Sequence, residues 1–296
     1  MSFVEVVDVG PRDGLQDAPV QLQALQRARL VAGLLAAGVP RVEAVSFVRP
    51  DRVPQMANAE HVVAALTVEQ RARSCGLVLN ERGYERLEAS GLPAFRFALA
   101  VSDAFHRRNA GASTRDGLAE AVRVLERARD AGLEGGVILA TSFGCPLSGE
   151  VTADEVLALT RELAAAGARE LVFADTIGVA VPRQIRAVVA PALELGPRIG
   201  IHLHNTRNTG YACTFAAIEE GVTLVESSLG GLGGCPFSPG ASGNIATEDL
   251  VHMLDREGIS TGIDLDALLA LGRALATHGL TLDSGVQKAG RFAAAA

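Results

Sequence analysis

The chain alternates short apolar runs with longer stretches rich in Ala, Leu, Arg and Glu. The apolar runs predict strands at residues 4–9, 41–47, 74–79, 95–101, 136–141, 170–174, 199–204 and 223–227. The stretches between them predict helices, several of which end at a glycine, as helix C-termini often do. Strands joined by helices run parallel, and their nearly continuous apolar character predicts cover on both faces.

Eight strand and helix units in 296 residues predict a closed (β/α)8 barrel. The alternative is an open doubly wound sheet, but the first apolar run is not followed by the G-x-G-x-x-G pattern of a dinucleotide fold. We therefore expect one barrel domain over residues 1–296, with roughly residues 262–296 as an additional C-terminal helical extension.

Charge and composition narrow the class of partner. The formal net charge of -7 argues against a nucleic-acid partner, which normally requires a basic surface. No apolar run reaches the roughly 18 residues that a membrane span needs, and the N-terminus lacks the pattern of a secretory signal. The four cysteines are scattered without a pairing pattern. These features predict a cytoplasmic protein with no membrane partner.

Polar residues gather where the predicted strands end. In a (β/α)8 barrel these ends meet at one face, which carries the active site. The set comprises Arg12 and Asp13, Glu43 and Ser46, Ser142 and Cys145, Asp175 and Thr176, His202 and His204, and finally Cys235 and Asn244.

The segment "IHLHN" places His202 and His204 two positions apart on one strand, so both imidazoles project to the same face. An isolated H-x-H is at least as often a pair of hydrogen-bonded interior residues. With Asp13, Asn244 and a substrate carbonyl as oxygen ligands, the set would suit a six-coordinate Mg²⁺ or Mn²⁺.

Two further features bear on catalysis. Glu43 would be costly to bury without a partner, and Arg12 on the neighbouring strand is the obvious one, either as a structural ion pair or as a guanidinium oriented toward an oxyanion. Because neighbouring side chains at a strand end usually diverge, we expect Arg12 and Asp13 to serve two different partners. Cys235 lies in a glycine-rich loop, where a thiol is placed for proton transfer or nucleophilic attack, although an inert buried cysteine is the commoner case. For Cys145 we favour a structural role.

Six motifs in order along the chain carry a family resemblance: "VGPRDGLQ", "EAVSFVRPDRVPQM", "FGCP", "FADTIGV", "HLHNT" and "GLGGCPFSPGASGNIATEDLVHML". With them the chain resembles 3-hydroxy-3-methylglutaryl-CoA lyase, within the wider group of metal-dependent (β/α)8 lyases and acyl-CoA condensing enzymes. The resemblance implies Asp13, His202, His204 and Asn244 as ligands of Mg²⁺ or Mn²⁺. It further implies Arg12, Glu43, Cys235 and His202 as catalytic residues.

The reaction that this resemblance implies is a retro-Claisen cleavage of the acyl-CoA thioester to acetyl-CoA and acetoacetate. Arg12 would steady the thioester enolate and Cys235 would protonate it, while a histidine ligand, Glu43 or a water on the metal would remove the hydroxyl proton. Substrate and CoA contacts are expected from Arg12, Gln16, Ser46, Ser142, Thr176, Arg107, Arg108 and Arg207. Arg107 and Arg108 are candidates for the CoA phosphates, with an exposed loop charge as the alternative. A homodimer and a place in leucine degradation and ketone-body metabolism are also implied.

One segment departs from the family pattern. After the two histidines, the better-known lyases have four residues in the order Asp, Thr, either Tyr or Arg, and Gly. This chain has Asn205, Thr206, Arg207 and Asn208 at these positions. This change weakens the case for hydroxymethylglutaryl-CoA itself and favours another 3-hydroxyacyl-CoA dicarboxylate as the alternative substrate. Two other hypotheses are a transferase that condenses an acyl-CoA with a 2-oxo acid, and a barrel kept only for binding.

Overall fold

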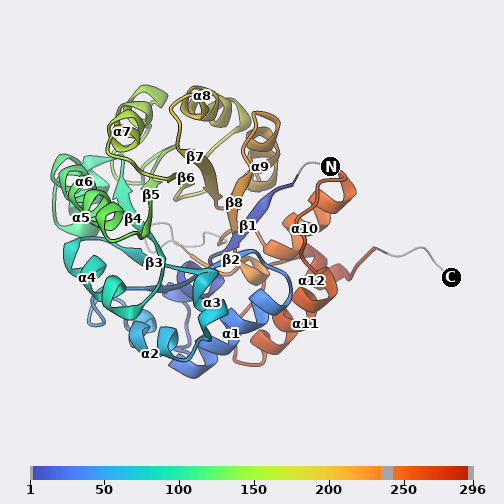
Figure 1. Cartoon of the computed structure of the whole chain (residues 1–296). Coiled ribbons are helices and arrows are strands. Elements are labelled where there is room, and N and C mark those ends of the chain that lie inside the picture. Colours follow the sequence, from blue (N-terminus) through green and yellow to red (C-terminus); the bar gives the residue numbers. More distant parts are fainter. Residues whose placement is uncertain (1–2, 235–242, 293–296) are drawn as a thin grey trace.

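The computed structural model describes residues 3–234 and 243–292. Eight parallel strands close into a barrel in chain order, and helices surround it (Figure 1), as the sequence predicted. The strands are β1 Glu5–Asp8, β2 Arg41–Ser46, β3 Ser74–Val78, β4 Ala94–Ala100, β5 Glu134–Ala140, β6 Glu170–Asp175, β7 Arg198–Leu203 and β8 Leu224–Ser227. β8 pairs with β1 and completes the ring.

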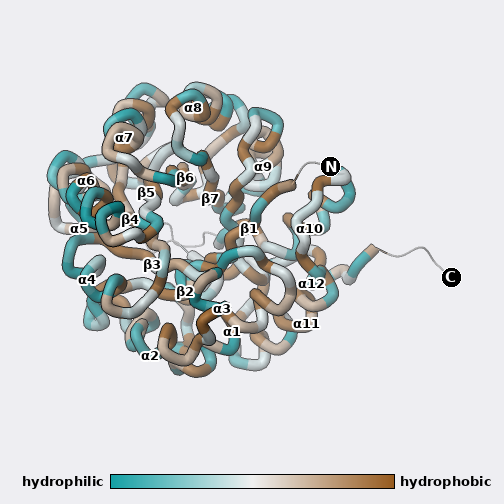
Figure 2. The backbone as a smooth tube through the Cα atoms, viewed as in Figure 1, coloured by the Kyte–Doolittle hydropathy of each residue, from teal (hydrophilic) through white to brown (hydrophobic). Residues whose placement is uncertain are grey.

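The helices around the barrel are α1 Ala24–Ala36, α2 Ala59–Ala64, α3 Val68–Ala72, α4 Glu81–Ser90, α5 Asp103–Ala110, α6 Thr114–Asp130, α7 Ala153–Ala165, α8 Pro182–Leu193, α9 Gly210–Glu219 and α10 Thr247–Arg256. Hydrophobic and hydrophilic residues alternate along them (Figure 2), as expected for helices that lie against a sheet on one side only. In α7, the Thr152 hydroxyl accepts from the Glu155 amide at 3.3 Å and the Glu155 carboxylate accepts from the Thr152 amide at 2.7 Å. This capping box fixes where the helix begins.

Two more helices follow α10. They are α11 Leu265–Ala276 and α12 Gly285–Ala289, and α11 packs against α1 and α10. The Asp249 carboxylate on α10 accepts from the amides of Gly285 and Val286, both at 2.8 Å, and so holds the start of α12. Within residues 3–234 and 243–292, no helix is long and apolar enough to cross a membrane.

The barrel interior combines an apolar layer with buried charges. Val7, Leu77, Ile138, Val172 and Leu224 form a buried cluster whose members come from different strands. Interdigitated side chains of this kind fill the core of such barrels. Buried charged side chains, among them Glu43, Arg96 and Glu226, also lie on the strands, and their contacts reach the site described below.

The loop after β1 forms a single π-helical turn, η1, at Gly10–Gly14. Its Gly14 amide donates to the Val9 carbonyl at 3.1 Å. A Cβ at Gly14 would lie 2.7 Å from the hydroxyl of Ser228, which directly follows β8, and one at Gly10 would lie 2.8 Å from Asp8 Oδ1 and 3.3 Å from the same hydroxyl. Glycine at both positions therefore lets the turn lie close to the end of β8, which places Arg12 and Asp13 at the barrel mouth.

Candidate active site

Six of the predicted residues lie together toward the face of the barrel where the strands end: Arg12, Asp13, Glu43, His202, His204 and Asn244. One ligand atom each from Asp13, His202 and His204 falls within 4.8 Å of the others. Although β1, β7 and the segment after residue 242 are far apart in sequence, barrel closure brings them to one point.

Arg12 is the buried cation of this site, with 5% of its surface exposed. Its Nε donates to Glu43 Oε2, and its Nη1 donates to Asp13 Oδ1 at 2.5 Å. The predicted pairing with Glu43 is present, but the expectation that Arg12 and Asp13 diverge was wrong. Both residues belong to η1 rather than to a strand end, and the turn directs their side chains to the same side.

Asp13 still serves two sets of partners through its two oxygens. Oδ1 accepts from Arg12, whereas Oδ2 accepts from Asn244 Nδ2 at 2.8 Å and lies 3.7 Å from His202 Nε2 and 3.8 Å from His204 Nε2. The two histidine Nε2 atoms are 3.3 Å apart. One carboxylate oxygen and two imidazole nitrogens therefore converge.

These atoms fit a divalent cation. Asn244 Nδ2 donates to Asp13 and, at 3.0 Å, to the Leu232 carbonyl, while Asn244 Oδ1 is buried and has no hydrogen-bond partner among the described residues. A buried amide oxygen is costly to leave unpaired, and a cation would satisfy it. The mixed set of oxygen and nitrogen donors suits Mg²⁺ or Mn²⁺ better than structural zinc.

Burial and neighbouring charges shift the pKa values of the titrating groups of the site in different directions. Burial opposes the ionisation of Asp13, but Arg12 and the two histidines outweigh it and hold its pKa well below the usual range. Burial also disfavours the His202 imidazolium, yet Glu226 and Asp13 raise the pKa of His202. For Glu43, desolvation and the charge of Glu226 prevail over Arg12 and raise the pKa. Asp13 is thus the permanent anion, and Glu43 is the carboxyl more ready to hold a proton.

Sequence reasoning missed two interior residues. Glu226 Oε2 lies 3.0 Å from His202 Nδ1, and Glu226 Oε1 accepts from Arg96 Nε at 2.8 Å. Burial opposes the ionisation of Glu226, but Arg96 and His202 lower its pKa to about 2. The sequence signal for both is a single charged residue inside an apolar run, which is the same pattern that singles out Glu43.

Three of the residues predicted to contact the substrate form hydrogen bonds to backbone groups of the protein itself. Ser142 Oγ donates to the Leu139 carbonyl at 2.7 Å, and Thr176 Oγ1 accepts from the Thr141 amide at 2.8 Å, which links the ends of β5 and β6. Arg207 Nη1 donates to the Ile177 carbonyl at 2.8 Å and so connects the loops after β6 and β7.

The other residues predicted to contact the substrate or CoA differ in how far they are buried. Ser46 is fully buried, and its hydroxyl has no partner within the part of the chain that the structure describes. Gln16 is half-buried just after η1. Arg107 and Arg108 are exposed on α5, which follows β4, and Arg107 pairs with Asp103 at 2.7 Å.

The cysteines divide into two groups. Cys235 lies outside the described residues, so its predicted role stays a prediction. Cys75, Cys145 and Cys213 are buried and free. Burial raises the pKa of both Cys75 and Cys213 to about 12, as expected for inert thiols. Burial has the same tendency at Cys145, but hydrogen bonds from Ser102, Ser148 and the Leu147 amide lower its pKa.

The fold and the converging donors define a (β/α)8-barrel enzyme with a possible divalent-metal site at the catalytic face. Comparison with known proteins specifies the family. The HMGL-like family model matches residues 3–275. The chain belongs to this family and is an enzyme of its lyase class.

Three relatives illustrate the match. The chain is 46% identical to the (R)-citramalyl-CoA lyase of Chloroflexus aurantiacus, covering 98% of this chain and 96% of that one. It is 36% identical to the hydroxymethylglutaryl-CoA lyase of Bacillus subtilis, over 91% of each chain. An HMG-CoA lyase structure from Acinetobacter baumannii, in complex with coenzyme A and 3-methylmalate, superposes with a TM-score of 0.94 at 35% identity, covering 99% of this chain and 97% of that one.

Proposed function

We propose that this chain is a divalent-metal-dependent lyase that cleaves the carbon-carbon bond of a 3-hydroxy-3-methyl dicarboxylic acyl-CoA, with Mg²⁺ or Mn²⁺ as its cofactor. The observation that carries the proposal is the convergence of Asp13 Oδ2 and both histidine Nε2 atoms beside Asn244 and a buried arginine. Membership of a family of CoA-ester lyases supports the same chemistry.

Citramalyl-CoA is the favoured substrate, and hydroxymethylglutaryl-CoA, which is longer by one methylene, is the second candidate. The citramalyl-CoA lyase is the more similar of the two named relatives, and the match extends over nearly the whole chain. The segment from Asn205 to Asn208 supports this choice. Asn205 accepts from the Gly210 amide at 3.2 Å, and Asn208 adopts a left-handed conformation with φ 57°. An Asp at 205 could accept the same hydrogen bond and a Gly at 208 adopts the same φ readily. The departure therefore changes the side chains at the mouth, where an amide replaces a carboxylate and a side chain is present at position 208.

The bound cation would act as a Lewis acid that polarises the substrate's hydroxyl and carbonyl oxygens. Asp13, His202, His204 and Asn244 would hold it. Removal of the hydroxyl proton by Glu43 or a histidine lets the hydroxyl oxygen form the new carbonyl as the C2–C3 bond breaks, and the electron pair passes to the thioester as an enolate. The products would be pyruvate from citramalyl-CoA, or acetoacetate from hydroxymethylglutaryl-CoA, together with acetyl-CoA.

Arg12 would stabilise the enolate oxygen. Its guanidinium is already oriented by Glu43 and Asp13, so little reorganisation is needed when charge develops, and stabilisation of this kind is usually the largest catalytic contribution. Cys235, in the glycine-rich loop, is proposed to protonate the enolate carbon. Gln16, Ser46, Ser142, Thr176 and Arg207 stay candidates for substrate contacts, and Arg107 and Arg108 for the CoA phosphates.

The test uses purified protein with (R)- and (S)-citramalyl-CoA and with hydroxymethylglutaryl-CoA, and follows pyruvate and acetoacetate with NADH-linked dehydrogenases. Pyruvate from one citramalyl-CoA enantiomer, at a higher kcat/KM than for hydroxymethylglutaryl-CoA, is the expected result. Release of free CoA from acetyl-CoA plus a 2-oxo acid, without cleavage of either thioester, would favour the condensing transferase instead. The single-domain boundary, a homodimer and a cytoplasmic location stay predictions.

A further inference from the structure

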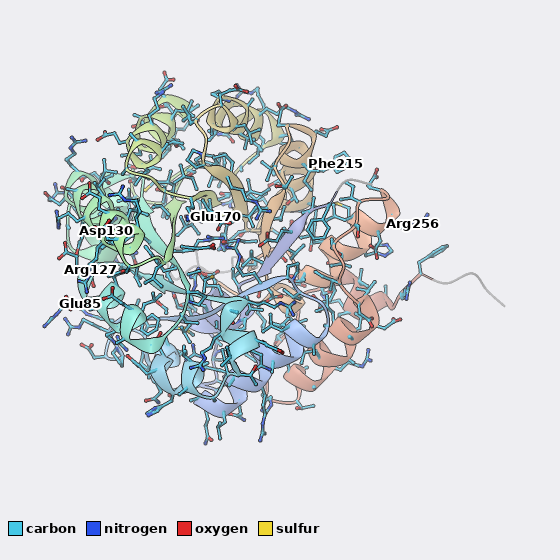
Figure 3. All side chains as sticks on the ribbon, in the orientation of Figure 1. Glu85, Arg127, Asp130, Glu170, Phe215 and Arg256 are labelled. Carbon is cyan, nitrogen blue, oxygen red and sulfur yellow. The ribbon has the colours of Figure 1, made fainter. Side chains whose placement is uncertain are left out.

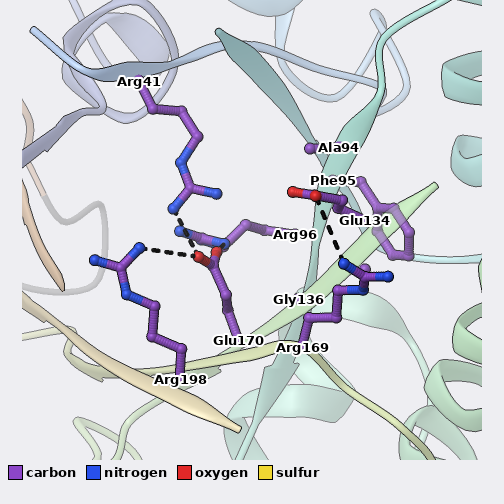
Figure 4. A pocket seen from close by; sticks show the side chains of 10 residues that line it. Arg41, Ala94, Phe95, Arg96, Glu134, Gly136, Arg169, Glu170 and Arg198 are labelled. Carbon is purple, nitrogen blue, oxygen red and sulfur yellow. Dashed lines mark hydrogen bonds and ion pairs between the residues drawn. The ribbon is translucent and has the colours of Figure 1, made fainter. Parts of the chain in front are cut away.

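The amino end of the barrel opposite the candidate site holds a polar cavity of about 200 Å³. Four arginines line it, and Figure 4 shows Arg41, Arg96 and Arg198 gathered around Glu170. Figure 3 places Glu170 near the middle of the barrel. Because Glu5, Glu134, Glu170 and Glu226 pair with these arginines, a bound anion would meet guanidinium groups whose charge is already compensated.

A continuous chain of contacts runs from this cluster through the barrel interior to the candidate metal site. Arg96 Nη1 donates to Glu170 Oε2 at 2.5 Å, and Arg96 Nε donates to Glu226 Oε1 at 2.8 Å. Glu226 Oε2 lies 3.0 Å from His202 Nδ1. Arg96, Glu226 and His202 are all buried, so water does not compete strongly for these contacts.

The two candidate histidine ligands differ in their support. His202 is held from behind by Glu226, whereas His204 Nδ1 is buried and has no partner among residues 3–234 and 243–292. A carboxylate accepts hydrogen bonds only, so Glu226 requires a proton on His202 Nδ1. The Nε2 lone pair of His202 then faces Asp13 and His204.

We propose that Glu226 is a positioning residue for the metal site: it fixes His202 in the Nδ1–H tautomer and ring orientation that a ligating Nε2 needs, and Arg96 orients Glu226 for this task. The inference rests on the proposed divalent-metal site. Carboxylates that support a metal-bound histidine in this way set ligand orientation and basicity, and their loss typically lowers metal affinity about 10–100-fold.

The variant E226Q tests the tautomer directly. A glutamine has one acceptor oxygen, and the charged Arg96 guanidinium is the stronger competitor for it. The glutamine NH₂ group then faces His202 Nδ1, which must accept, and the proton moves to Nε2 where the cation should bind. We expect the affinity for Mn²⁺, measured by the electron paramagnetic resonance signal of free Mn²⁺, to fall about 10–100-fold.

Two further variants separate positioning from general damage. E170Q alters the other carboxylate on Arg96 without touching His202, and we expect its Mn²⁺ affinity to stay within about threefold of the wild type, since Glu226 is intact. In R96M/E226Q the competing donor is gone, so the glutamine oxygen is free to accept from His202 Nδ1–H. This double variant should therefore bind Mn²⁺ more tightly than E226Q alone.

A ¹⁵N NMR spectrum of the metal-free wild type gives a test that needs no variant. At pH 8.5 we expect His202 Nδ1 to carry a proton, and an unprotonated Nδ1 would overturn the proposal. Equal losses of Mn²⁺ affinity in E226Q and E170Q, or none in either, would also overturn it while leaving the metal site intact. A wild type that binds no Mn²⁺ would defeat the proposed function together with this inference.

Discussion

Glu248 is a fully buried carboxyl near the start of α10, and it predicts an unusual dependence of stability on pH. Its Oε2 accepts from the Gly230 amide at 2.8 Å, whereas Oε1 has no partner in the described part of the chain. Desolvation, together with the charges of Asp8 and Asp249, raises its pKa from 4.5 to about 7. The ionised form is therefore disfavoured in the folded state.

The linkage between proton binding and folding gives the direction in which stability changes with pH. The folded state binds this proton more tightly than the unfolded chain, so wild-type stability falls as pH rises from about 4.5 to about 7. A pKa difference of this size corresponds to about 3 kcal/mol of unfolding free energy above that range. The variant E248Q stays neutral and keeps an acceptor for the Gly230 amide. Glu248 Oε1 and Gln287 Oε1 both lie close to Gly272. The new NH₂ group of the glutamine at position 248 therefore lies near Gln287 Oε1.

We expect E248Q to be more stable than the wild type by about 2–3 kcal/mol at pH 8 and nearly equal to it at pH 4.5. Urea unfolding at pH 4.5, 6 and 8, followed by circular dichroism, measures the difference. The matched control is E257Q, an exposed position at the end of the same helix. An E248Q protein that is less stable than the wild type at pH 8, or a difference that does not change with pH, would refute the reasoning.

Three further predictions concern the site and its surroundings. Arg12→Lys keeps the charge but loses the fork that bonds both Glu43 and Asp13, so kcat should fall about 10²–10³-fold in a steady-state assay, and a loss below tenfold would argue against enolate stabilisation. Asn244→Ala removes a candidate ligand oxygen, and calorimetric titration with Mn²⁺ should show an affinity at least about tenfold weaker, whereas an unchanged affinity would exclude that role. Arg27 is buried and donates to the backbone carbonyls of Gln55 and Ala57, so Arg27→Met should lower the unfolding free energy by about 1–3 kcal/mol in urea titrations while kcat stays close to that of the wild type.

The fold could be predicted because each strand is a short, nearly continuous apolar run. Such a run can be recognised from the local sequence without information about tertiary contacts. All eight predicted runs are strands, with ends that differ by at most two residues. The π-helical turn at η1 was not predictable, because it depends on the close approach of Gly10 and Gly14 to β8. That turn is why Arg12 and Asp13 contact each other.

The candidate site was predictable where its residues lie at strand ends, since barrel closure gathers those positions whatever their separation in sequence. Glu226 and Arg96 are different, because they lie within strands 130 positions apart in the chain. Their contact depends on which side chains point inward and on the stagger of β4 against β8. Local sequence contains neither piece of information.

The most direct test of the central claim is the cleavage of citramalyl-CoA with and without a chelator. With Mg²⁺ or Mn²⁺ present, we expect acetyl-CoA and pyruvate in equal amounts, measured by mass spectrometry and an NADH-linked assay. Chelation should abolish turnover, and added metal should restore it. Cleavage that persists after complete removal of divalent metal, or no cleavage of citramalyl-CoA or hydroxymethylglutaryl-CoA with metal present, would contradict the account.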